Sequence, residues 1–160
     1  MTTVPSASRR PFMIVIAVLL FVFVILQFVR FVVPDFQISN PPATRTITWD
    51  SARTEVLWTQ TCGDCHSSAT RWPWYAYVAP VGWLVALDVN KGRREFDILN
   101  ANSRVETDEM IEQIREGEMP LPIYLPLHPE ANLNAEDQAA LIAGLRATFR
   151  EGLRRGATSN

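Results

Sequence analysis

Cysteine and histidine are scarce in this sequence of 160 residues. The only cysteines are Cys62 and Cys65, and there are two histidines. One closely spaced pair of cysteines excludes the framework of several disulfides that stabilises many small secreted domains. The sequence also offers few ligands for a structural zinc ion. Its four ligands would have to be Cys62, Cys65, His66 and the distant His128. The scarcity therefore favours one local cofactor or redox motif.

The chain also lacks an excess of basic residues. Lys and Arg number 15 against 17 Asp and Glu, for a formal net charge of −2. From Pro34 onward the basic residues number 12 (15 minus Arg9, Arg10 and Arg30), whereas all 17 acids lie there. Nucleic-acid binding requires a basic face, so we expect no nucleic-acid partner.

The sequence contains no useful apolar–polar alternation of the kind found in β-strands, and no internal repeat. Apolar residues instead recur at helical spacing behind residues that cap helices. We therefore predict an all-α fold. The predicted helices run from Asp50 or Ser51 to about Thr61, from Pro80 to near Gly92, from Thr107 or Asp108 to Gly117, and from Asn134 along an apolar stripe to Phe149.

One long apolar run lies near the N-terminus. Residues 12–33 are interrupted only by Gln27 and Arg30. A helix over this run would rise about 33 Å, which is enough to cross a bilayer once. A cleaved signal peptide and a buried core helix are the competing interpretations. The apolar stretch of a signal peptide is shorter and is followed by small residues, whereas Phe-Val-Val-Pro-Asp-Phe follows here. We therefore predict a retained transmembrane anchor.

These features divide the chain into four parts. Residues 1–11 are predicted to be a cytoplasmic tail, and residues 12–33 the transmembrane anchor. Residues 34–48 contain Asn-Pro-Pro and little apolar periodicity, so we expect an extended, proline-containing linker. Residues 49–155 then form the globular helical domain.

The sequence Cys62-Gly-Asp-Cys65-His66 has the pattern that attaches c-type haem. Two thiols add across the two vinyl groups on one porphyrin edge, and the following imidazole reaches the iron. Cys62 and Cys65 are therefore the predicted attachment residues for one covalent haem c, and His66 is the predicted iron ligand. Thiol oxidoreductases share the paired cysteines, but their motif lies between a strand and a helix, and no strand pattern is present here.

The second axial ligand of the iron has two candidates. Met119 lies in a Gly-Glu-Met-Pro sequence, where the following proline favours an extended backbone that can aim the thioether into a pocket. We predict Met119 as this ligand. His128 is the alternative, and an open position is the third possibility. Arg71 and Arg93 are candidate partners for haem propionates.

The residues around the motif resemble a known family. The segments that carry the resemblance are Cys62 to Tyr75, Ala79-Pro80-Val-Gly-Trp83, Val89-Asn-Lys-Gly-Arg93, Gly117-Glu-Met-Pro120, Tyr124 and Leu127-His-Pro129. Together they are similar to the small haem-binding domain family of bacterial cytochromes, over residues 40–149. The resemblance implies a helical domain like class I cytochrome c that carries one covalent haem.

These inferences combine into an expected function. Covalent attachment of haem takes place outside the cytoplasm, so we expect a single-pass protein of the cell inner membrane with its haem domain in the periplasm. A His and Met pair favours reversible one-electron transfer. We expect an electron carrier, or a subunit of a larger membrane redox complex, that meets redox partner proteins and is not an enzyme. The alternative is a peroxidase-like haem enzyme or ligand sensor with an open distal site.

Overall fold

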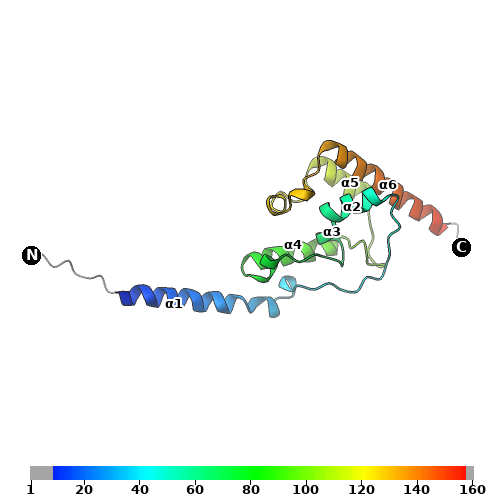
Figure 1. Ribbon diagram of the computed structural model, residues 1–160. Coiled ribbons are helices and arrows are strands. Elements are labelled where there is room, and N and C mark those ends of the chain that lie inside the picture. The colour runs from blue at the N-terminus through cyan, green and yellow to red at the C-terminus, as the bar shows by residue number, and fades with distance from the viewer. Residues whose placement is uncertain (1–8, 158–160) are drawn as a thin grey trace, which may run out of the picture. The chain divides into compact units, whose positions relative to one another are not determined.

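The computed structural model describes residues 9–157, with side chains for residues 9–149 (Figure 1). Every regular element in this part of the chain is a helix, which confirms the all-α prediction. Its internal contacts group the described residues into two compact units. We call residues 9–38 with 73–87 the N-terminal unit, and residues 39–72 with 88–157 the motif unit.

The N-terminal unit begins with the apolar helix α1, Arg9–Leu26, none of whose residues is buried. Two short 3-10 helices follow, η1 (Val29–Phe31) and η2 (Pro34–Phe36). The stretch Arg9–Phe31 is long enough to span a membrane and has a mean hydropathy of 3.2. No part of it is buried within the protein. Such a helix near an N-terminus is either a membrane anchor or a signal sequence. Residues 1–8 of the predicted cytoplasmic tail lie outside the described residues.

The second segment of the N-terminal unit, residues 73–87, packs against the end of the apolar helix. This segment contains η3 (Trp74–Tyr77) and the start of α4 (Val81–Glu95). The Ala79 N–H donates to Gln27 Oε1 at 2.8 Å. The rings of Phe36 and Trp83 are stacked, with centroids 5.4 Å apart and an interplanar angle of 7°. No local pattern in the sequence indicates this association, because it joins residues 52 positions apart.

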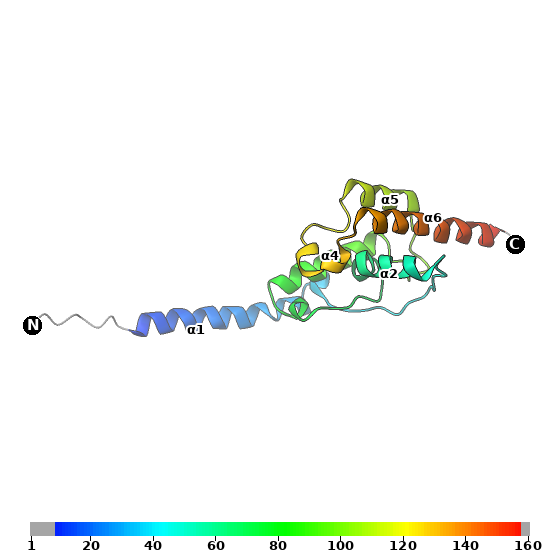
Figure 2. The ribbon, with the colours of Figure 1, turned by 45° about the horizontal axis from the view of Figure 1, so that its top comes forward.

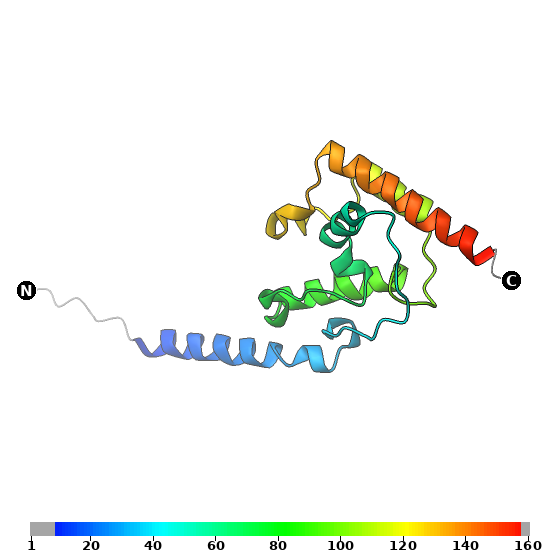
Figure 3. The same cartoon turned by 45° about the vertical axis from the view of Figure 1, so that its right-hand side comes forward.

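The motif unit is built around helix α6, Ala135–Ala157. Helices α2 (Ala52–Thr61) and α5 (Thr107–Glu116) both pack against it, and α5 lies alongside it in Figure 2 and Figure 3. Apolar residues four positions apart on α5 and on α6 meet the adjacent Leu57 and Trp58 of α2 in one core. The buried members of that core are Leu57, Trp58, Ile98, Met110, Ile114, Leu141 and Leu145.

The helix ends mostly follow the predicted signals. Ser51 Oγ accepts the Thr54 N–H at 3.2 Å, and Asn134 Oδ1 accepts the Asp137 N–H at 2.9 Å, as expected for N-caps. Gly117 ends α5 with a φ of 74°, a conformation that favours glycine.

Two predicted helix ends were wrong. The N-cap of α5 is Glu106, so Thr107 is the first helical residue instead of the cap. Helix α4 runs past Gly92 to Glu95. Gly92 lies inside the helix, where its missing side chain permits close packing against Cys65.

Residues 39–48 are attached to the rest of the motif unit. The backbone N–H groups of Thr44 and Arg45 both donate to Leu99 O, at 2.9 and 2.8 Å. The Arg45 guanidinium donates to the carbonyls of Ile98 and Asp97, at 2.8 and 3.2 Å. This stretch has no regular secondary structure, whereas the first residues of the predicted linker form η2. The hydrogen bonds of Thr44 and Arg45 attach it to the segment that follows α4. The four domain boundaries drawn from the sequence stay predictions.

Gly144 lets α2 approach α6 closely, and this contact makes a prediction. A Cβ added at Gly144 would lie 2.6 Å from Thr54 Cγ2 and 2.8 Å from Thr54 Cβ. We expect Gly144→Ala to lower the free energy of unfolding by about 1–3 kcal/mol, because the helices must separate or strain. Thr54→Ala should partly rescue it in a double-mutant cycle measured by urea unfolding. Additive losses would contradict this packing.

Candidate functional site

The predicted attachment motif lies at a break between two helices. Helix α2 ends at Thr61, and Cys62 leaves the helical conformation with φ −121° and ψ −27°. The short helix α3, Gly63–His66, follows at once. The N–H groups of Cys65 and His66 both donate to Cys62 O, at 3.2 and 2.9 Å. The structure therefore brings Cys62, Cys65 and His66 together within one compact turn.

His66 is buried and oriented by its neighbour Phe96. The two rings are stacked, with centroids 4.1 Å apart and an interplanar angle of 14°. His66 Nδ1 lies 3.3 Å from Phe96 O, a contact in which a protonated Nδ1 is the donor. This tautomer leaves the lone pair on Nε2, and burial lowers the pKa of His66. A neutral imidazole with one nitrogen fixed by a backbone carbonyl is the form that binds metals.

The two thiols are half-buried and protonated at neutral pH. Burial raises the pKa of Cys62 and of Cys65 to about 12. Helix α4 packs closely against Cys65 at Gly92. A Cβ added at Gly92 would lie only 2.7 Å from Cys65 O and 3.1 Å from Cys65 Cβ. The backbone of α4 can therefore reach the motif only where a side chain is missing.

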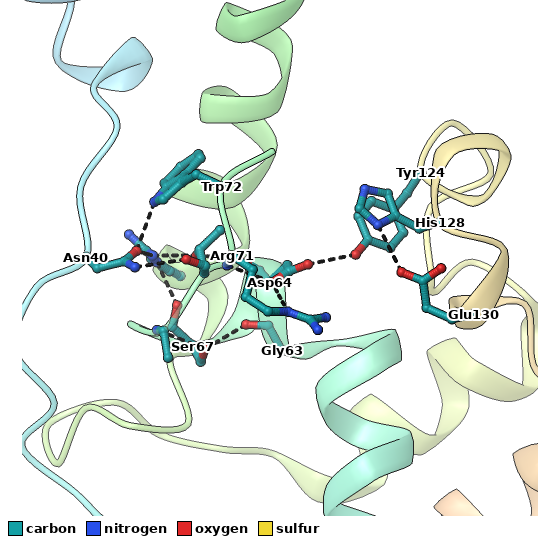
Figure 4. Close-up of polar contacts among 12 residues, drawn as sticks. Asn40, Gly63, Asp64, Ser67, Arg71, Trp72, Tyr124, His128 and Glu130 are labelled. Atoms are coloured by element: carbon teal, nitrogen blue, oxygen red, sulfur yellow. Dashed lines mark hydrogen bonds and ion pairs between the residues drawn. The ribbon is translucent and has the colours of Figure 1, made fainter. Parts of the chain in front are cut away.

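Asp64, between the two cysteines, is a buried carboxylate with several partners (Figure 4). Its Oδ1 accepts the Arg71 N–H at 2.9 Å and lies 3.5 Å from Arg71 Nε. Its Oδ2 accepts the Tyr124 hydroxyl at 2.9 Å. Burial, followed by the charge of Asp64, raises the pKa of Tyr124 above its usual range, so the hydroxyl stays a donor. These bonds offset the cost of burying the charge.

The loop that carries Met119 reaches the motif through this tyrosine. Met119 is half-buried after α5, and its N–H donates to Gln113 O at 3.2 Å. Tyr124, five residues later, bonds to Asp64 and stacks on His128, with ring centroids 3.8 Å apart. His128 Nδ1 lies 3.3 Å from Glu130 Oε1. Met119 as an iron ligand stays a prediction.

Arg93 joins the chain on both sides of the motif. Its Nε donates to Ser67 O at 2.8 Å, and its Nη2 donates to Thr70 Oγ1 at 2.6 Å and Asn40 Oδ1 at 2.8 Å. The Trp72 indole N–H also donates to Asn40 Oδ1, at 3.0 Å (Figure 4). The guanidinium expected to pair with a haem propionate thus has a structural role in this unit.

Asp97 supports the segment after the motif. Its Oδ1 accepts the N–H groups of Ser68 and Leu99, at 3.1 and 2.9 Å, and its Oδ2 accepts the Ser68 hydroxyl. Neither Asp97 nor Asp64 is among the site residues predicted from the sequence, and Asn40 lies in the predicted linker. Their roles have no local sequence signal, because each also bonds to a distant residue: Asp64 to Tyr124, Asn40 to Thr70 and Asp97 to Ser68.

The residues present fit a covalently bound haem. Two thiols and a neutral, oriented imidazole supply the required donors. In addition, Trp58 Nε1 is buried without a hydrogen-bond partner in the described residues, as is Trp83 Nε1 in the N-terminal unit. Trp58 lies one helical turn before Cys62, whose N–H donates to Trp58 O. An unpaired buried donor costs about 1–3 kcal/mol, and an acceptor on a bound group, such as a propionate, would remove that cost.

A four-ligand zinc site is not supported. Among the residues that the structure describes, no group of three or more His, Cys, Asp or Glu side chains could hold a metal ion. Cys62, Cys65 and His66 therefore do not form a zinc site by themselves, since a structural zinc ion requires four protein ligands around one point.

Comparison with known proteins gives a match to a protein family. A family model described as a haem-binding domain matches residues 21–147. The matched region contains the motif, Met119 and the first half of α6. No curated protein and no solved structure matches the chain.

The bond between Tyr124 and Asp64 leads to a second prediction. Tyr124→Phe removes one donor from a buried carboxylate, so we expect the free energy of unfolding to fall by about 1.5–3 kcal/mol. Tyr77→Phe is the matched control, because Tyr77 is half exposed and should change stability by less than about 0.5 kcal/mol. Chemical unfolding followed by helix content measures both. Equal effects of the two variants would show that the Tyr124 bond has no net value.

Proposed function

Because the chain belongs to the haem-binding domain family, we propose that it is a membrane-anchored monohaem c-type cytochrome. It transfers single electrons on the outer side of the membrane, as a carrier or as a subunit of a larger redox complex. One observation carries the proposal: Cys62 and Cys65 share a compact turn with His66, whose Nδ1 is held by Phe96 O.

In this proposal the protein binds and orients its cofactor. The sulfur atoms of Cys62 and Cys65 would hold the porphyrin, and His66 Nε2 would bind the iron. The Phe96 carbonyl keeps Nδ1 protonated and the imidazole in one orientation. The haem supplies a reversible one-electron couple. The buried surroundings of His66 would limit access of water to the bond between its imidazole and the iron.

We propose Met119 as the second axial ligand. Its loop is fastened to the motif by the Tyr124–Asp64 bond, so the thioether lies on a segment of restricted position. The rival, His128, has its ring stacked on Tyr124 and its Nδ1 close to Glu130. These contacts favour a packing role for His128. A thioether ligand raises the reduction potential relative to a second imidazole, which suits a carrier more than an oxygen-activating enzyme.

We also propose that α1 is a retained anchor in the inner membrane and that the motif unit is periplasmic. The contacts inside the N-terminal unit support retention. Gln27 accepts a hydrogen bond from Ala79, and Phe36 stacks on Trp83, so the end of the apolar stretch is packed against a later segment of the chain. A signal peptide that is cleaved away has no such partner in the mature protein. Covalent haem attachment outside the cytoplasm then sets the orientation.

Covalent attachment is the direct test of this function. On a haem-stained denaturing gel the full-length protein should carry colour, because thioether bonds survive denaturation. The double variant Cys62→Ala and Cys65→Ala should lose that colour, whereas Ser67→Ala, next to the motif, should keep it. A redox titration of the wild-type protein should follow a one-electron Nernst curve. Colour that leaves the intact protein in acidic organic solvent would refute covalent attachment.

The identity of the second ligand separates a carrier from an enzyme or ligand sensor. The oxidised protein should show the weak far-red band of a thioether bound to ferric haem. Met119→Ala should abolish this band, lower the reduction potential and admit carbon monoxide to the ferrous protein. His128→Ala should keep the band and nearly the same potential. Prompt carbon monoxide binding by the wild-type protein would instead support the open-site alternative.

A further inference from the structure

The segment Pro73–Leu87 exposes several large apolar side chains. No residue in it carries a charged side chain. Trp74 is 78% exposed, Tyr77 50% and Leu84 54%. Val78 and Val81 are exposed as well. Contiguous apolar patches on soluble proteins usually mark a surface that meets a partner or a membrane.

This segment is packed against the far end of the apolar helix. The Ala79 N–H donates to Gln27 Oε1 at 2.8 Å. The Arg30 guanidinium lies 5.8 Å from the ring centroid of Tyr77, and Phe36 and Trp83 are stacked 5.4 Å apart. All three contacts lie within the N-terminal unit. They fix the exposed apolar side chains beside residues 27–36.

The length of α1 places those residues near a membrane surface. The apolar residues of α1, Phe12–Leu26, correspond to a rise of about 23 Å, so a hydrocarbon core of roughly 30 Å ends within residues 27–33. The polar side chains in that stretch are Gln27 and Arg30. An arginine at this depth directs its guanidinium to the lipid headgroups.

We propose that the exposed face of Pro73–Leu87 lies in the headgroup region of the bilayer, with Trp74, Val81 and Leu84 in contact with lipid. This inference rests on the proposed membrane anchor. Tryptophan and tyrosine are enriched at this depth because their rings are apolar with one polar atom. The occupant is lipid, because the face belongs to the same compact unit as the membrane span and lies beside the residues where that span ends.

Photo-crosslinking to lipid tests the proposal with the full-length holoprotein. The protein would be reconstituted into vesicles of phosphatidylethanolamine and phosphatidylglycerol. A diazirine side chain would be placed singly at Leu84, and Trp74 would serve as a second position in case one variant folds poorly. Val56 is the matched control, because it is an aliphatic residue on a helix with 52% exposure, but belongs to the motif unit. Phe21, inside α1, reports on the anchor itself.

We expect lipid adducts by mass spectrometry at positions 84, 74 and 21, with a higher yield at 84 and 74 than at position 56. Adducts at 21 without adducts at 84 and 74 would overturn this proposal and leave the anchor intact. Missing adducts at all four positions would refute the anchor and the proposal together. Equal adducts at 56 and 84 would show unspecific surface contact, and a crosslinked dimer at 84 would assign the face to a second copy of the chain. Both of these results would also overturn the proposal.

Discussion

The close approach of α4 to the motif is the constraint on which the rest of the motif unit depends. Gly92 has no side chain, so the α4 backbone can lie against the backbone of Cys65. The next residue, Arg93, can then bond to Ser67 and Thr70, and Phe96, just beyond the helix end, can stack on His66. The missing side chain of Gly92 thus lets Arg93 hold the segment after the motif and lets Phe96 hold the His66 imidazole.

Polar side chains around the motif mainly satisfy the backbone. Arg93 and Arg45 donate to carbonyl groups of irregular segments, and Asp97 accepts backbone N–H groups. These segments contain little secondary structure of their own, so their backbone groups need side-chain partners when they are buried. The charged residues here are therefore better understood as replacements for a hydrogen-bonded ladder than as a binding surface.

Local signals predicted most of the fold, whereas contacts between distant segments did not follow from the sequence. The caps at Ser51 and Asn134 depend on residues three positions away, so a local pattern reveals them. A glycine at position 92 predicts the end of a helix. Its actual role is to let α4 approach Cys65, which lies in another helix and cannot be identified from the local sequence. The Tyr124–Asp64 bond and the packing of residues 73–87 against the apolar helix escaped for the same reason. At the site, the spacing of Cys62, Cys65 and His66 indicates their chemistry. The residues that hold them in place cannot be identified from the spacing.

The two residues between the cysteines are not equivalent. A Cβ added at Gly63 would meet its nearest neighbour, the Trp58 ring, at an ordinary van der Waals distance of 3.4 Å, whereas Asp64 is buried and bonded to two distant parts of the chain. A motif grafted here from another protein could preserve both cysteines and the histidine and still sever the Tyr124 loop. Position 64 and position 124 should therefore be inherited as a pair, with exchange at one accompanied by exchange at the other in related chains.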